Sequence, residues 1–248
     1  MRMFGLIGYP LSHSFSKKFF SEKFLNEGVT DCIYENFSIP FIEQFEQLIA
    51  QTPLEGLNVT IPYKQQIIQY LHMTNEVVAK IGACNCIKFK NGKLYGYNTD
   101  IIGFEQSLKK YLLPHHTKAI ILGTGGAAKA IMYVLEKLKI SYISVSRNEA
   151  GKKAQFLSYE SLTDDLIRSH TLIINTTPLG MYPDIDTCPP INYDLLTPLH
   201  YLFDAIYNPA MTLFLKKGKE KHASIQSGFD MLIIQAEESW KIWNNDEE

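Results

Sequence analysis

The segment from residue 118 to residue 138 constrains the fold of this chain more than any other part of the sequence. The apolar run Ala119–Leu122 stops at Gly123 and Gly125, and an amphipathic helical pattern follows at once. A strand, a tight glycine turn and a helix in this order point the backbone N–H groups of the helix N-terminus at an anion. The glycines permit the turn and the close approach of a pyrophosphate. The stretch therefore predicts a dinucleotide site in the middle of the chain.

The spacing of the turn is the alanine-ended variant of the Rossmann fingerprint. It is written Gly123-x-Gly125-x-x-Ala128, and Thr124, Gly126 and Ala127 fill the other positions of the turn. The alternative is an ordinary glycine turn between a strand and a helix, without a ligand. The rest of the chain has to decide between the two interpretations.

Composition excludes several classes of protein. The chain has 248 residues, 46% of them hydrophobic, and a formal net charge of −2. It can bury a large core in one or two domains, but it offers no basic surface for nucleic acid. No apolar run approaches the ~20 residues of a membrane span, and no signal-peptide pattern opens the chain, so we expect a soluble, cytoplasmic protein. The four cysteines and seven histidines show no metal-site spacing, and we expect no metal.

Strand and helix patterns alternate along both halves of the chain, which predicts an α/β fold with mostly parallel sheets. A second α/β domain is expected to begin near residue 102. Strands are expected over 3–8, 32–37, 56–61, 85–90, 93–97, 118–122, 142–145, 172–175, 202–206 and 223–226. Helices are expected from 15 to about 28, 41–49, from 62 onward, 75–81, 101–111, 126–138, 152–158, 212–217 and from 228 to the last turn.

The residues after the strand 142–145 bear on the choice of cofactor. NAD-binding versions of the fold place a carboxylate there, whereas this chain has Ser146, Arg147 and Asn148. A guanidinium pairs with a 2′-phosphate, which favours NADP over NAD. The alternative is that Arg147 is an ordinary surface residue, and the nearby Glu149 is a signal against a phosphate.

Polar clusters follow three strands of the first half, at the edge where ligands of open α/β sheets bind. Lys64 and Asp100 are candidates for acid–base chemistry, because an ammonium can protonate an alkoxide and a carboxylate can orient the ammonium. The alternative is a solvated lysine and a helix N-cap. Ser14 and Ser16 suit a carboxylate or cap a helix. Thr60, Asn58 and Asn85 bond substrate hydroxyls or stabilise turns.

Taken together, these segments resemble the shikimate dehydrogenase family over nearly the whole chain and in the family's order. The matching motifs are Gly8-Tyr9-Pro10 with His13–Ser16, Asn58–Lys64, Gly82–Asn85, Gly96–Asp100, Gly123–Ala127, Asn175–Met181, Asp204–Pro209 and Met231–Gln235. Each motif alone is modest, but eight in order are highly specific.

The resemblance implies reversible, NADPH-dependent reduction of 3-dehydroshikimate to shikimate in aromatic amino-acid biosynthesis. It implies two domains, a substrate domain of residues 1–101 plus 228–248 and a Rossmann-type NADP domain of residues 102–227, with the last helix returning to the first domain. It implies a small-molecule substrate, no nucleic-acid or membrane partner, and a monomer or homodimer.

The resemblance also implies roles for individual residues. Lys64 is the proton-transfer residue, and Asp100 is paired with it. The substrate carboxylate falls to Ser14 and Ser16, and the ring hydroxyls to Thr60, Asn85, Asp100, Gln235 and the nearby Tyr207. The cofactor residues are Gly123, Thr124, Gly125, Gly126, Ala127, Ser146, Arg147, Thr176, Ala205, Gly228 and Glu76.

Two departures from the family pattern leave alternatives open. The family's Asn-Arg-Thr is Ser146-Arg147-Asn148 here, which keeps the arginine and loses a flanking partner. The usual glycine before the last helix is Asp230, which either alters cofactor affinity or caps the helix. The alternatives are a quinate/shikimate dehydrogenase that prefers NAD and a non-catalytic dinucleotide- or ligand-binding module on the same fold.

Overall fold

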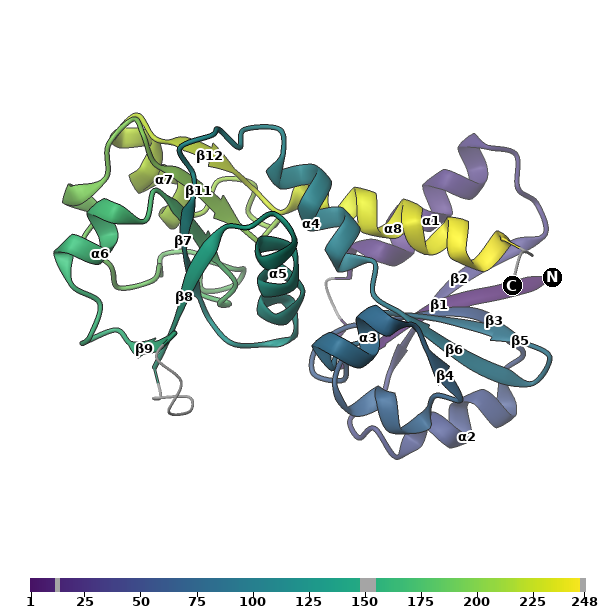
Figure 1. Cartoon of the computed structure of the whole chain (residues 1–248). Helices are drawn as coiled ribbons and strands as arrows, with labels where there is room; N and C mark the ends of the chain where they lie inside the picture. The colour runs from purple at the N-terminus through teal and green to yellow at the C-terminus, as the bar shows by residue number, and fades with distance from the viewer. Residues whose placement is uncertain (12–13, 148–154, 246–248) are drawn as a thin grey trace. The chain divides into compact units, whose positions relative to one another are not determined.

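The computed structural model describes residues 1–11, 14–147 and 155–245. The chain divides into two compact units, Met1–Thr99 with Ala236–Glu248 and Asp100–Gln235. Each unit is built on a six-stranded sheet (Figure 1). The α/β class expected from the alternating patterns is confirmed.

The sheet of the first unit has the strand order β2-β1-β3-β5-β6-β4. Only β5 runs antiparallel to its neighbours, so the sheet is mostly parallel, as predicted. The strands are β1 (Arg2–Gly8), β2 (Cys32–Ser38), β3 (Leu54–Val59), β4 (Met73–Thr74), β5 (Cys86–Lys90) and β6 (Lys93–Tyr97). The helices are α1 (Phe15–Asn26), α2 (Gln44–Gln51), the 3₁₀ helix η1 (Gln66–Tyr70), α3 (Glu76–Ile81) and the second half of α8 (Phe229–Asn244).

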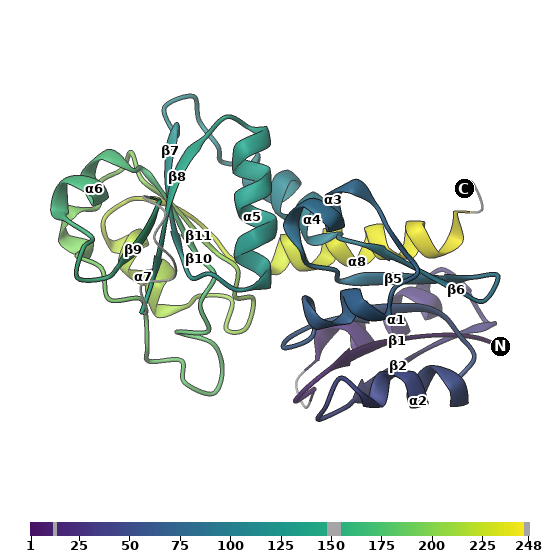
Figure 2. The ribbon, with the colours of Figure 1, turned by 60° about the horizontal axis from the view of Figure 1, so that its bottom comes forward.

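Alternation along β1 builds a separate hydrophobic core on each face of this sheet. Phe4 and Leu6 pack with α1 and the end of α8, whereas Ile7 packs on the opposite face with Phe45 of α2. Figures 1 and 2 show α1 and α8 on one side of the sheet and α2 on the other. Since successive side chains of a strand point to opposite faces, both cores follow from the period of two.

The sheet of the second unit has the order β9-β8-β7-β10-β11-β12, and all its pairs are parallel. This is the strand order of the dinucleotide-binding fold, with the reversal between β7 and β10. The strands are β7 (Lys118–Leu122), β8 (Ser141–Ser146), β9 (Phe156–Ser158), β10 (Leu172–Asn175), β11 (Tyr201–Asp204) and β12 (Ser224–Gln226). The helices are α4 (Asp100–Leu108), α5 (Gly126–Lys137), α6 (Asp164–Ser169), the 3₁₀ helix η2 (Tyr193–Leu195), α7 (Leu213–Glu220) and the start of α8.

Both faces of the second sheet are covered. Ile167 of α6 and Phe214 of α7 join the core on one face. On the other face, Phe104 of α4 meets Phe203 of β11 edge-on at 5.0 Å, and α5 buries Ile131 and Val134. Such burial on both faces explains why β7 and β10 are continuous apolar runs.

Some expected elements are wrong. The helix expected over 152–158 is contradicted where the structure describes it, because residues 156–158 form the edge strand β9 beside β8; residues 152–154 lie outside the described part. The helix expected from Pro62 is a series of turns that leads into the short η1. The helix expected over 101–111 is shorter, ending at Leu108. The short elements β4 and α6 carry too little periodicity to be found from the sequence.

Candidate active site

The glycine turn lies at the reversal of the second sheet. Gly123 follows β7 directly and has φ +114°, a conformation that favours glycine. A Cβ there would lie 2.4 Å from the Oγ1 of Thr176, which follows the neighbouring strand β10. The Thr176 hydroxyl donates to the Leu122 carbonyl at 2.8 Å and holds the two strand ends together. Gly123 is therefore packed against the end of β10, and its backbone is also bonded to β8 on the other side.

Gly125 has a different reason to be glycine. It stands at the N-cap of α5 with φ −73° and ψ −170°, which any residue adopts. A Cβ built there meets no heavy atom within 4 Å. Neither backbone strain nor packing within the described protein requires glycine, so the remaining requirement is close approach by an outside group. The turn and the N-terminus of α5 thus fit a pyrophosphate.

The other predicted cofactor residues of this unit lie at the carboxyl ends of neighbouring strands. Ala205 follows β11, and its N–H donates to the Asn175 carbonyl at 2.9 Å. Gly228 follows β12, and a Cβ there would lie 2.3 Å from the Ala205 carbonyl oxygen. Glycine at 228 therefore allows these two chain segments to touch.

Ser146 ends β8, and Arg147 follows it with an exposed side chain. Asn148 and Glu149 lie outside the described residues. The positive charge of Arg147 lowers the pKa of the Tyr159 phenol, against a larger increase from burial. Arg147 thus follows β8, the strand beside the glycine turn. Residues at this position of the dinucleotide-binding fold contact the 2′-hydroxyl or the 2′-phosphate of the cofactor ribose.

In the first unit, the serines of the predicted carboxylate site differ in their contacts. Ser14 stands at the N-cap of α1 without a capping hydrogen bond, and its buried hydroxyl has no hydrogen-bond partner among the described residues. Ser16 hydrogen-bonds the buried phenol of Tyr34, whose pKa burial raises well above its usual value. Of the two hydroxyls, that of Ser14 would gain more from a hydrogen bond to a ligand, because it is buried and has no partner among the described residues.

A buried network of uncharged polar groups supports this edge. Tyr34 donates to the Oδ1 of Asn58 at 2.8 Å, and the Asn58 amide donates to Ser239 at 2.9 Å. Ser239 meets the Thr99 hydroxyl at 3.2 Å, and Thr99 receives a bond from the Asn85 amide at 3.0 Å. The network joins strand ends of the sheet to α8. Predicted substrate residue Asn85 is thus also a structural residue.

Thr60 and Lys64 occupy the turns after β3. The carbonyl of Thr60 accepts from Tyr63 N at 2.9 Å, and the carbonyl of Lys64 accepts from Cys84 N at 2.7 Å. These bonds fix the backbone of both candidates beside the segment that leads to Asn85. Glu76, by contrast, is exposed in the first turn of α3.

Asp100 and Gln235 belong to the second unit, on two helices that pack against each other. A Cβ on Gly103 would lie 3.2 Å from the Cβ of Gln235, so α4 and α8 pack in close contact. Asp100 begins α4 with a buried side chain three residues before Gly103, on the same helix face. Tyr207 lies in the loop after β11. Since Lys64 and Asp100 belong to different compact units, their pairing stays a prediction.

Asp230 has a structural role that the sequence left undecided. Its Oδ2 pairs with Lys110 at 2.8 Å and accepts from Gln226 at 3.1 Å. Gln226 also donates to the Ser107 hydroxyl at 2.7 Å. The carboxylate therefore ties the start of α8 to the end of α4 and to β12.

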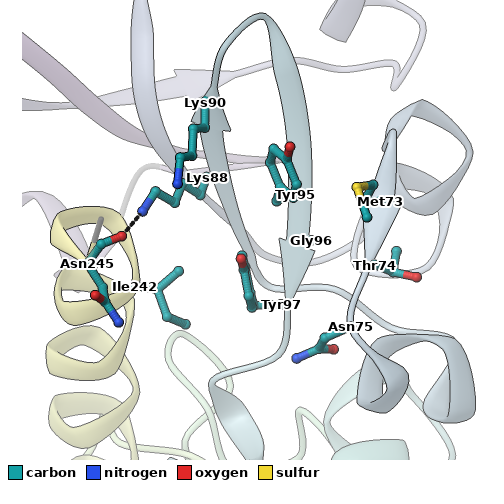
Figure 3. A pocket seen from close by; sticks show the side chains of 10 residues that line it. All are labelled: Met73, Thr74, Asn75, Lys88, Lys90, Tyr95, Gly96, Tyr97, Ile242 and Asn245. Carbon is teal, nitrogen blue, oxygen red and sulfur yellow. Dashed lines mark hydrogen bonds between the residues drawn. The ribbon is translucent and has the colours of Figure 1, made fainter. Parts of the chain in front are cut away.

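A groove of about 480 Å³ lies on the first sheet beside the end of α8 (Figure 3). Its lining includes Lys88, Lys90, Tyr95 and Tyr97, and the Lys88 ammonium donates to the carbonyl of Asn245. None of the predicted site residues lines it. Within the described residues, no group of three or more potential metal ligands and no helix long and apolar enough to cross a membrane occurs.

The strand order, the open glycine turn and a second α/β unit with its own polar edge define the class of two-part, dinucleotide-dependent dehydrogenases. A family profile described as the shikimate dehydrogenase substrate binding domain matches residues 6–87. The NADP(+)-type shikimate dehydrogenase of Clostridium beijerinckii is 40% identical over 98% of this chain and 92% of its own length. The chain belongs to the shikimate dehydrogenase family.

Solved structures agree with this membership. Shikimate dehydrogenase from Aquifex aeolicus has a TM-score of 0.87 at 36% identity, covering 98% of this chain and 92% of its own. The Thermus thermophilus enzyme, solved with NADP(H) and shikimate, has a TM-score of 0.87 at 26% identity, covering 98% and 94%. The fold is therefore shared over almost its whole length.

Proposed function

We propose that this protein is an NADP-dependent shikimate dehydrogenase, which reversibly reduces 3-dehydroshikimate to shikimate in the pathway to chorismate and the aromatic amino acids. The observation that carries the cofactor part is the open face of Gly125 at the N-terminus of α5, with Arg147 one strand away. Relatives named as NADP(+) shikimate dehydrogenases over 98% of the chain support the substrate part.

The residues of the second unit suit the binding of NADP. The turn Gly123–Ala127 and the N-terminus of α5 would hold the pyrophosphate, and the Arg147 guanidinium the 2′-phosphate. Thr176, Ala205 and Gly228 would line the rest of the site. When bound, the reduced cofactor supplies a hydride to the substrate carbonyl carbon.

The residues of the first unit suit the substrate. The buried Ser14 hydroxyl would donate to the carboxylate, with Ser16 beside it. Thr60 and Asn85 would bond ring hydroxyls, because the hydrogen-bond network behind Asn85 fixes its orientation. Asp100, Gln235 and Tyr207 would make the remaining polar contacts to the substrate.

Reduction of the ketone creates an alkoxide that needs a proton. The Lys64 ammonium would donate it, and in the reverse direction neutral Lys64 would accept it from the hydroxyl. The Asp100 carboxylate would orient the ammonium. In this role Lys64 would contribute to the rate of turnover and not to the affinity for substrate.

We further propose the functional domains 1–101 with 228–248 for substrate and 102–227 for cofactor, and a cytoplasmic monomer or homodimer. These limits differ from the compact units mainly in the assignment of the start of α8. Light scattering of the purified protein determines the oligomeric state.

The deciding experiment compares four initial rates, NADP and NAD each with shikimate and with quinate. We expect the highest kcat/KM with NADP and shikimate. A preference for NAD would instead favour the quinate/shikimate alternative. Absence of turnover with every pair, together with retained NADP binding, would establish the non-catalytic binding module.

A further inference from the structure

Two loops that carry predicted cofactor and substrate residues meet at one buried carboxylate. The strands β10 and β11 are paired in register, so Asn175 and Asp204 end them side by side. Both side chains are fully buried. Thr176 follows Asn175, and Ala205 follows Asp204, so each predicted cofactor residue is the immediate neighbour of a buried polar one.

The carboxylate of Asp204 accepts three hydrogen bonds from three different segments. Its Oδ1 accepts from the Asn175 amide at 3.0 Å and from the Ile206 backbone N–H at 3.0 Å. Its Oδ2 accepts from the Thr212 hydroxyl at 2.6 Å, and Thr212 also caps α7. One side chain thus holds the loop after β10, the loop after β11 and the start of α7.

Asn175 extends this arrangement along the loop after β10. Its Oδ1 accepts from the N–H of Thr177 at 3.0 Å and from the Thr177 hydroxyl at 2.7 Å. The two loops also meet directly, since Tyr182 N donates to the Asn208 carbonyl at 3.3 Å. Asp204 and Asn175 together thus connect the loop after β10 with the loop after β11.

We propose that Asp204 is a positioning residue, which fixes the two loops in the conformation that receives the dinucleotide and touches neither cofactor nor substrate itself. The inference rests on the proposed function, because the loops matter only if they line a cofactor site. Charge-assisted bonds explain the choice of residue: they are about twice as strong as neutral ones, and they orient backbone N–H groups in fixed directions.

Burial raises the pKa of Asp204 to about 6, and its hydrogen-bond donors partly offset this increase. The ionised form, which predominates above that pKa, presents both oxygens as acceptors to the three donors. A carboxylate kept ionised in a buried place destabilises the folded state unless its bonds are complete. The loss of stability from burying this carboxylate is explained if the same carboxylate fixes a loop that binds the cofactor.

The test measures amide hydrogen exchange in the two loops and the affinity for NADP+, both without turnover. We expect Asp204→Ala to accelerate amide hydrogen exchange at Thr177, Leu179 and Ile206 in the unliganded protein. We expect the dissociation constant for NADP+, measured by calorimetry, to rise about 10–100-fold, the equivalent of one or two strong hydrogen bonds. The kcat at saturating cofactor is expected to change much less than KM.

Three comparison variants make the result specific. Asp204→Asn keeps one oxygen for Ile206 and Asn175 but loses the charge and the acceptor of Thr212, so it should recover part of the affinity. Thr212→Val, the substitute if Asp204→Ala does not fold, should raise the dissociation constant less. Asp194→Ala removes an exposed carboxylate paired with Lys221 in the same unit and should change nothing.

Two failures are distinguishable. If the unmodified protein does not bind NADP+ at all, the proposed function is wrong. If it binds NADP+, and the folded Asp204→Ala variant or, failing that, Thr212→Val binds equally well with unchanged exchange in both loops, the positioning role of Asp204 is wrong.

Discussion

The two units end their parallel strands in opposite ways. The first unit places side chains at that edge. Lys64, Thr60 and Asn85 all lie in segments whose backbone is held by hydrogen bonds. The second unit places backbone there, since Gly123 and Gly125 remove side chains and leave the N-terminus of α5 open. Side chains of several kinds can recognise a small polyol acid, whereas exposed N–H groups recognise phosphate.

The buried polar groups below the two edges differ as well. In the first unit, Tyr34, Asn58, Thr99 and Ser239 form a network in which no group changes charge near neutral pH. The second unit buries the titratable groups Asp204, His116 and His200. The polar network of the first unit is thus insensitive to pH near neutrality, whereas the buried polar groups of the second unit are sensitive to it.

The largest effect expected concerns Lys64. If the first unit supplies the chemistry, Lys64→Ala lowers kcat by about 10²–10⁴-fold, the usual contribution of a general acid. Affinity for NADP+ should stay within about twofold, because Lys64 is not among the residues proposed to hold the dinucleotide. Steady-state kinetics and calorimetry check both, with the exposed Lys18→Ala as control. Unchanged turnover would remove Lys64 from the mechanism.

Arg147 tests the second unit, where the cofactor is proposed to bind. Arg147→Ala should weaken NADP+ binding by about 10–100-fold, because a charge-assisted contact to the 2′-phosphate is lost. Binding of NAD+ should change little, and kcat with saturating NADP even less. The exposed Arg168 of α6 provides a control through Arg168→Ala. Equal weakening of both cofactors would show that Arg147 does not read the 2′-phosphate.

Asn58 tests the neutral network. Asn58→Ala removes the acceptor of the Tyr34 phenol and one donor to Ser239 in a buried place, and the free energy of unfolding should fall by about 1–3 kcal/mol. The loss should be the same at about pH 6 and pH 8, where none of these groups titrates. Urea unfolding followed by tryptophan fluorescence is suited to this unit, since Trp240 and Trp243 are the only tryptophans of the chain. Gln51→Ala, at the exposed end of α2, should cost less than about 0.5 kcal/mol.

Acidification should affect the second unit first. The pKa values of His116 and His200 are lowered by burial, and each Nδ1 accepts a backbone N–H, from Leu113 at 2.9 Å and Thr197 at 3.0 Å. A pKa below the unfolded value of 6.5 means that stability is complete above 6.5 and falls as the pH falls towards the folded pKa.

Other charges modify this loss. Asp204, with its raised pKa of about 6, has the opposite sign: it destabilises the folded state at neutral pH, and this cost disappears as the pH falls below about 6. Burial also lowers the pKa of His170, so this residue adds to the loss of stability in acid. Hydrogen exchange at about pH 7 and about pH 5 should show opening of β7 and β11 before β1 and β3, and His200→Gln should reduce the difference. If both units opened at the same pH, the second unit would not be the more acid-sensitive of the two.

Long, strongly patterned segments were predictable from the sequence. The strand expected over 172–175 is β10 with the same bounds, because a parallel strand buried on both faces is a plain apolar run between polar residues. Short elements were not: β9 exists only because it pairs with β8 at the sheet edge. After Pro62, the carbonyl of Lys64 accepts from Cys84 N, a bond to a distant segment that no local pattern contains.

The sequence by itself determined the α/β class, the family and the kinds of residue at both polar edges, since these depend on periodicity, glycine spacing and the order of motifs. Only the tertiary structure decided that Gly125 faces open space, that Asp230 ties α8 to α4, and that Asn58, Asp204 and Ser239 support the edges from below. Their partners are distant in the chain or lie on neighbouring strands. Hydrogen bonding depends on distance in space, and register and packing set that distance.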